Sequence, residues 1–200
     1  ITKQLLKFQL PSPFHTQSKR QEFYVKPYLE LLRLISDLGS ISKDEIALFF
    51  LQLTHLNKYQ EILNKILAFR ANKASFNGSY KTYVHHVAST EIQQLFEYEI
   101  SNGKLKTRET TDDSLAYFIQ TKRNNMNDYA DAFMRYLRGT QLVTVDARTY
   151  RMLISTINKK EVEFKLMDVM RKNMIDESNK VLANTVPADN NSSSQKEIKD

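Results

Sequence analysis

Between residues 27 and 70, apolar side chains recur at intervals of three and four, which is the spacing of one face of an α-helix. The pattern predicts three consecutive amphipathic helices, with Pro27 at the start of the first and Gly39 at its end. Ser42 and Glu45 have the spacing of a capping box, so the second helix is expected to begin there. The apolar positions are Tyr28, Leu31, Leu32, Ile35 and Leu38, then Ile46, Phe49, Phe50 and Leu53, then Tyr59, Ile62, Leu63, Ile66 and Leu67. Three such helices can bury one shared core.

The pattern is weaker from residue 71 to residue 138. Residues 72–80 are polar and include a glycine, which predicts a loop, and a helix is expected over 91–100. After a charged linker, helical spacing resumes near residue 112, and the polar residues 122–125 interrupt it. It restarts at Met126 and continues to Leu137. We therefore predict two helices separated by a polar turn.

The apolar spacing changes from helical to alternating after residue 141. Leu142, Val143 and Val145 precede a turn candidate at 146–149, and apolar and polar residues then alternate over 150–155. A helix followed by a two-stranded ribbon is typical of a winged helix. We predict a mainly α fold of tandem helical units with a short β-wing. The expected parts are an arm and helix-turn-helix-like unit at 1–103, a winged-helix unit at 104–156, a charged helix at 157–183 and a disordered tail or linker at 184–200.

Composition narrows the classes of protein. Among the 200 residues, 4 are Gly and 4 are Pro, which favours helices over a turn-rich sandwich. Cysteine is absent, which excludes disulfides, cysteine-zinc sites and thiol nucleophiles and permits a cytoplasmic location. The sequence shows neither a membrane-spanning run nor a signal peptide. Because the chain begins at Ile1 rather than Met, we expect it to be part of a longer protein.

A net charge of +6 suits a surface that binds a polyanion, although a merely solubilising charge is the alternative. The polar interruption places basic and amide side chains before the last long helix, where a recognition helix would meet base edges. Arginine and lysine pair with guanine, and asparagine pairs with adenine. An ordinary turn between helices is the other interpretation. The residues are Lys122, Arg123, Asn124, Asn125 and Asn127.

Five further basic residues are candidate DNA contacts. Arg138 lies near the end of the last helix, Arg148 and Arg151 flank the proposed wing, and Lys19 and Arg20 lie in the N-terminal arm. A basic arm and a wing arginine can neutralise phosphates of the DNA backbone. The alternative interpretation is that these side chains are solvated on a surface loop and a surface hairpin and contact no partner. Arg135 shares a side with Arg138, but we expect a solvated side chain there, with Asp131 as a possible partner.

Catalytic and metal-binding patterns are not convincing. The four histidines lack ligand spacing, and no glycine-rich phosphate loop or Ser-His-Asp arrangement is present. Glu163 and Lys165 match the Glu-x-Lys pattern of restriction nucleases, with Asp146 as an upstream candidate. We reject this match because its surroundings are charged, whereas a catalytic strand should be hydrophobic. The chain is expected to hold no metal, no cofactor and no small-molecule substrate.

Several stretches of sequence resemble AlwI-type restriction and nicking endonucleases of Type IIS, specifically their DNA-recognition region. They are LLKFQLPSPFH at 5–15, PYLELLRLI at 27–35, LGSISKDEIALFF at 38–50, TKRNNMNDYAD at 121–131 and RYLRGTQLV at 135–143. The resemblance covers residues 1–165, and the segment 71–110 matches none of these stretches. It implies binding to a short asymmetric site in double-stranded DNA, with cleavage in a separate module. The parent nuclease would use Mg²⁺, and this chain would bind DNA without cutting it.

Two other classes of protein fit the same residues. A winged-helix transcriptional regulator or a phage-type replication factor would share the basic surface and lack a nuclease partner. A helical protein-interaction module would show no salt-dependent binding to DNA. The residues that follow position 200 in the parent gene, and a DNA shift assay at several salt concentrations, would distinguish these readings.

Overall fold

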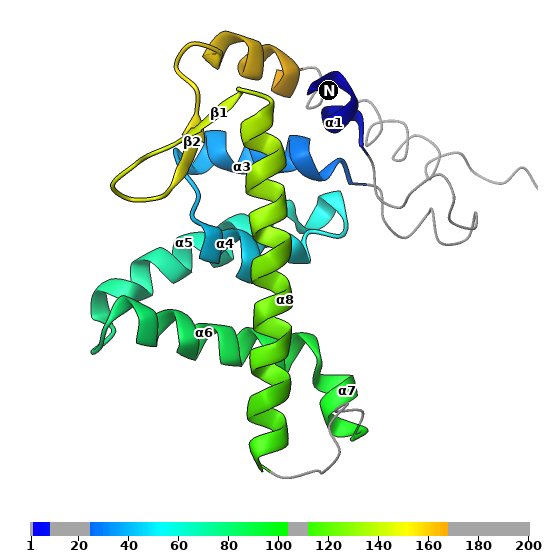
Figure 1. Cartoon of the computed structure of the whole chain (residues 1–200), viewed down its shortest axis with the longest axis vertical. Coiled ribbons are helices and arrows are strands. Elements are labelled where there is room, and N and C mark those ends of the chain that lie inside the picture. Colours follow the sequence, from blue (N-terminus) through cyan, green and yellow to red (C-terminus); the bar gives the residue numbers. More distant parts are fainter. Residues whose placement is uncertain (1, 9–24, 104–111, 168–200) are drawn as a thin grey trace, which may run out of the picture. The chain divides into compact units, whose positions relative to one another are not determined.

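The structure is a computed structural model that describes residues 2–8, 25–103 and 112–167 (Figure 1). The chain divides into two units, residues 1–162 and 163–200, and the described part of the second is the helical stretch 163–167. The elements are α1 (Thr2–Lys7), α3 (Pro27–Leu38), α4 (Lys43–Leu48), η1 (Phe50–Gln52), η2 (Leu56–Lys58), α5 (Tyr59–Ser75), α6 (Tyr80–Leu95), α7 (Glu97–Ser101), α8 (Asp112–Gly139), β1 (Val143–Val145) and β2 (Met152–Ile154). A mainly helical fold with a small two-stranded sheet is confirmed.

The turn between α3 and α4 follows the local sequence signals. Pro27 stands in the first turn of α3, and Gly39 ends that helix with a φ of 74°, in the left-handed region that favours glycine. The Ser42 hydroxyl accepts a hydrogen bond from the Glu45 N–H, and the Glu45 carboxylate accepts one from the Ser42 N–H. The predicted capping box is therefore confirmed, although α4 already ends at Leu48.

The loop predicted over 72–80 is wrong in most of its length. Helix α5 continues to Ser75, and α6 begins at Tyr80, where the Ser79 hydroxyl accepts from the Thr82 N–H. Tyr83 holds the two helices together, because its ring stacks on Phe69 at 5.0 Å and its hydroxyl donates to the Phe69 carbonyl. The polar residues of this stretch are exposed, which is why their hydropathy did not reveal the helices. The predicted helix at 91–100 is split between α6 and α7, which ends at Ser101.

The predicted turn at 122–125 is also wrong, because α8 is continuous from Asp112 to Gly139. Lys122 occupies a position on the buried side of this helix, with its ammonium 4.1 Å from the centre of the Phe96 ring and 5.1 Å from that of Phe118. A lysine can fill such a position because its aliphatic stem packs on apolar surface while its charge interacts with aromatic faces. The buried face of α8 thus passes through the polar stretch without a break.

The predicted β-ribbon is confirmed. Strands β1 and β2 pair antiparallel, with Val143 opposite Ile154 and Val145 opposite Met152. Asp146 stabilises the turn, because its carboxylate accepts hydrogen bonds from the N–H groups of Arg148 and Thr149. These bonds, foremost the one from Thr149, lower the pKa of Asp146.

A segment more than a hundred residues earlier in the sequence pairs with strand β2 of the ribbon. Ile41, between α3 and α4, exchanges two backbone hydrogen bonds with Met152, at 2.9 and 2.8 Å. Phe133 of α8 packs between Tyr28 of α3, at 4.9 Å, and Phe50, at 5.3 Å. In Figure 1, α8 accordingly crosses α3 and α4. Among the described residues of 1–162, α3, α8 and the ribbon are therefore joined by direct contacts, whereas the predicted bounds at 103 and 156 stay predictions.

Candidate nucleic-acid interface

One side of α8 is exposed along most of the helix. Because an α-helix has 3.6 residues per turn, positions three and four apart share a side, as do Asn124, Asp128, Asp131 and Arg135. We call this side the outer face of α8. Its exposed residues are Tyr117, Gln120, Thr121, Asn124, Asn125, Asp128, Asp131, Arg135 and Arg138.

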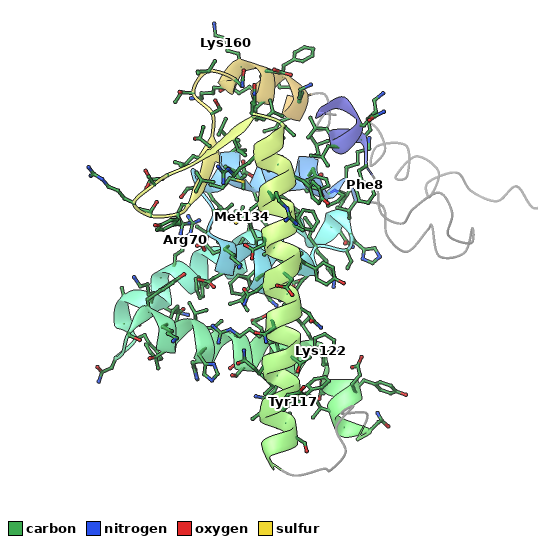
Figure 2. All side chains as sticks on the ribbon, in the orientation of Figure 1. Phe8, Arg70, Tyr117, Lys122, Met134 and Lys160 are labelled. Atoms are coloured by element: carbon green, nitrogen blue, oxygen red, sulfur yellow. The ribbon has the colours of Figure 1, made fainter. Side chains whose placement is uncertain are left out.

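The polar stretch 122–127 does not form the single cluster that we predicted. Lys122 faces the rings of Phe96 and Phe118, on the part of α8 beside α7 (Figure 2). Arg123 contacts α6, where its guanidinium lies 3.0 Å from Nδ1 of His85. Asn124 and Asn125 are exposed on the outer face, and Asn127 is half-buried. A continuous helix distributes consecutive residues around its axis, so within this stretch Asn124 lies centrally on the outer face and Asn125 at its edge, about 100° further around the helix.

The basic residues at the C-terminal end of α8 remain accessible. Arg135 and Arg138 are exposed, and the described residues include no ion pair for either of them. Arg135 instead has its guanidinium 5.7 Å from the ring of Tyr136. The suggested pairing of Asp131 with Arg135 is wrong, because Asp131 pairs with Lys43 of α4. Two arginines on the outer face are therefore available to an anionic partner.

The two arginines of the predicted wing have different environments. Arg148 is exposed at the turn of the hairpin. Arg151 points back into the protein, where its Nε donates to the Ser40 hydroxyl at 2.8 Å and its guanidinium pairs with Glu45 at 2.7 Å. Arg151 therefore fixes the hairpin to α4, and the prediction that its side chain contacts DNA does not fit this geometry.

Glu45 is the centre of a buried ionic cluster that the sequence did not reveal. Its side chain is 1% exposed and accepts from Arg70 at 2.7 Å as well as from Arg151. Burial acts to raise the pKa of Glu45, but the bonds from Arg70 and Ser42 and the charges of both arginines lower it overall. Figure 2 shows Arg70 in the region where α5 approaches the hairpin. The capping box could have identified Glu45, but its arginine partners are distant in sequence.

Glu30 is equally buried on α3 but poorly paired. Its side chain is 1% exposed, its Oε2 lacks a hydrogen-bond partner within the described residues, and Arg33 lies 3.5 Å away. Burial raises the pKa of Glu30 above its ordinary value of 4.5. The folded state therefore favours the protonated form of Glu30 more than the unfolded chain does.

Replacing Glu30 with glutamine is expected to stabilise the protein by about 1 kcal/mol at pH 7, because the substitution removes a buried charge that Arg33, at 3.5 Å, compensates only in part. The raised pKa means that the wild-type protein loses stability as the pH rises through the pKa of the folded state. Below pH 4.5, the ordinary pKa of a glutamate, the free energies of unfolding of the wild-type and Glu30→Gln proteins should therefore become equal. Urea unfolding at pH 4 and pH 7 measures the difference. A wild-type protein that is more stable than Glu30→Gln at pH 7 would contradict this expectation.

The described residues do not fit a Mg²⁺ site. In the part of the chain that the structure describes, no three histidine or acidic side chains gather as metal ligands. Glu163 and Lys165 lie in a helical stretch, where a nuclease Glu-x-Lys motif would require a strand, and Asp146 is engaged in the hairpin turn. We therefore assign no cleavage step to these residues.

Other sequence predictions concern residues outside the described ranges. These are the arm residues Lys19 and Arg20, the part of the charged helix beyond 167 and the tail at 184–200. Residues 159–167 are helical, in agreement with the predicted charged helix.

Comparisons with known proteins point to one family. A family model for the AlwI restriction endonuclease matches residues 1–200. A search of curated proteins finds no match. None of the helices in the described part of the chain combines the length and the apolar composition that a membrane span requires.

Proposed function

The chain belongs to the AlwI restriction endonuclease family, and on this premise we propose that it recognises a short sequence in double-stranded DNA. Membership in a family of restriction enzymes implies DNA as the partner. More specifically, we propose that this chain is the recognition region of a Type IIS-like restriction or nicking enzyme. Because restriction enzymes act on DNA inside the cell, we propose a cytoplasmic location.

The observation that carries the proposal is the outer face of α8. The major groove of DNA admits an α-helix, and base edges are read there by side chains with several donors and acceptors. Asn124 and Asn125 offer amides suited to adenine, and Arg135 and Arg138 offer guanidinium groups suited to guanine or to phosphate. The exposed Arg148 extends the positive charge onto the hairpin.

The order of the packed elements supports the same interpretation. A helix (α3), a short extended segment at Ile41, a second helix (α4), a third helix (α8) and a hairpin follow one another, and the extended segment pairs with the hairpin. A winged helix has this order of elements, and here α5, α6 and α7 are inserted before the third helix. We propose that α8 is the recognition helix of such a domain.

DNA binding is tested by a shift assay at several salt concentrations. Binding that releases counterions weakens as salt rises, with a slope of about −0.9 per phosphate contact. Arg138→Ala and Arg148→Ala are each expected to reduce the slope by about one unit if these side chains touch phosphates. Lys58→Ala removes an equal charge at the end of η2 and serves as the matched control. Binding without salt dependence would favour the protein-interaction module instead.

The chain is expected to leave plasmid DNA intact in the presence of Mg²⁺, since we propose that cleavage belongs to a separate module of the parent protein. Agarose electrophoresis of supercoiled plasmid distinguishes intact, nicked and linear forms. Metal-dependent nicking that disappears in Glu163→Ala would overturn this expectation and restore Glu163 as a catalytic candidate.

A further inference from the structure

Two carboxylates lie on the outer face of α8, and they differ in their surroundings. Asp131 is paired with Lys43 of α4. Asp128 is exposed, and the described residues provide it with neither a hydrogen bond nor an ion pair. Its neighbours one turn away on the helix are Asn124 and Asn125 on one side and Asp131 on the other. Within the described residues, the Asp128 carboxylate therefore makes no polar contact that stabilises the fold.

An unpaired carboxylate on a surface that meets DNA has an electrostatic cost. Double-stranded DNA carries about one negative charge per 1.7 Å of its axis, so Asp128 weakens binding to any sequence unless it gains a specific contact. The like charge of Asp131, three residues further along the helix, also destabilises α8 by a few tenths of a kcal/mol. Asp128 thus serves neither the stability of α8 nor general affinity for DNA.

A specific contact is available in the major groove. An ionised carboxylate only accepts hydrogen bonds, and the N4 amino group of cytosine is the base-edge donor that aspartate and glutamate pair with. The same carboxylate repels the acceptor atoms of guanine and the O4 of thymine, so it selects against wrong bases as well as for the right one.

We infer that Asp128 is a specificity-determining residue, which accepts a hydrogen bond from the N4 amino group of one cytosine in the recognised sequence. The inference rests on the proposed function, because it requires the outer face of α8 to lie in the major groove. Asn124 and Asn125, one turn earlier, contact the neighbouring base pairs.

The experiment is a selection of bound duplexes from a pool with a randomised centre, using the full chain and its variants. The wild-type chain should enrich a motif with cytosine at one position. Asp128→Ala should reduce the preference for cytosine at that position by roughly 5- to 140-fold, and leave the other positions unchanged. Asp128→Asn should move the preference there toward adenine, because an amide pairs with adenine.

The control variant is Glu97→Gln, which removes an exposed negative charge from α7 and should leave the motif unchanged. Binding to random duplexes and its salt slope should not fall in Asp128→Ala, since no phosphate contact is lost. If the wild-type chain enriches a motif and Asp128→Ala enriches the same motif equally, the inference is wrong and DNA recognition stands. If the wild-type chain enriches nothing and does not bind DNA, the proposed function fails together with the inference.

Discussion

Replacing Glu45 with glutamine is expected to lower the free energy of unfolding by about 3 kcal/mol at pH 7. Removing one partner of a buried ion pair typically costs 3–5 kcal/mol, because the remaining charge is left without compensation. The low end applies here because the side chains of Arg70 and Arg151 are 29% and 26% exposed and can be partly hydrated. For a protein of this size the melting temperature should fall by roughly 6–12 °C.

The pH dependence of this loss has a defined sign. The pKa of Glu45 is lowered in the folded state, so its contribution is present above the ordinary value of 4.5 and is lost as the pH falls through the lower folded value. The difference between wild type and Glu45→Gln should therefore shrink below pH 4.5, whereas the gain from Glu30→Gln disappears there. Two equally buried carboxylates, on α3 and α4, thus have opposite effects at neutral pH.

A matched control is available on α5. Glu61 is 57% exposed and lies 3.9 Å from Lys65, as an i,i+4 pair on the surface of the helix. Glu61→Gln should change the stability by less than about 0.5 kcal/mol. Chemical unfolding of the three proteins gives the comparison. A loss in Glu45→Gln no larger than that in Glu61→Gln would show that the ionic cluster does not hold the hairpin to α4.

Asn124→Ala is expected to weaken binding to the selected DNA site by about 1–3 kcal/mol, with a much smaller effect on random DNA. The reason is that Asn124 lies on the outer face of α8, where its amide can reach base edges. Arg123→Ala should weaken both kinds of binding little, because Arg123 is turned toward His85 of α6. Competition titrations with the selected and a scrambled duplex measure both variants.

The outcome separates two views of the polar stretch in α8. If Arg123→Ala costs as much specificity as Asn124→Ala, the side of α8 that faces α6 takes part in reading DNA. Thr121→Ala, an exposed change on the outer face without loss of an amide, controls for altered packing of the helix. Melting temperatures of all three variants confirm that each remains folded.

Local signals in the sequence determined much of this fold. Pro27, Gly39 and the Ser42–Glu45 capping box act within a few residues of themselves, so the ends of α3 and the start of α4 could be predicted. Alternation of apolar residues after Leu142 predicted the hairpin for the same reason, since side chains on a strand alternate between its two sides. The family resemblance likewise came from contiguous residues, and the match over residues 1–200 confirms it.

Other features depended on contacts between distant parts of the chain. The exposed polar residues from 72 to 80 concealed the end of α5 and the start of α6. Lys122 concealed the continuity of α8, because a lysine belongs to the buried side of the helix there through its contacts with the rings of Phe96 and Phe118. The separation of Arg123 from Asn125 followed from the unbroken helix.

The tertiary structure alone decided the roles of the arginines. Arg148 and Arg151 are three residues apart and were predicted to act alike, but only Arg151 reaches Ser40 and Glu45, which precede it by more than a hundred residues. No local pattern records such a contact, because it exists only when Ile41 and Met152 pair and bring α4 beside the hairpin. The sequence alone therefore supplied the family and the short-range elements, whereas long-range packing decided which charged side chains hold the fold and which remain exposed for a partner.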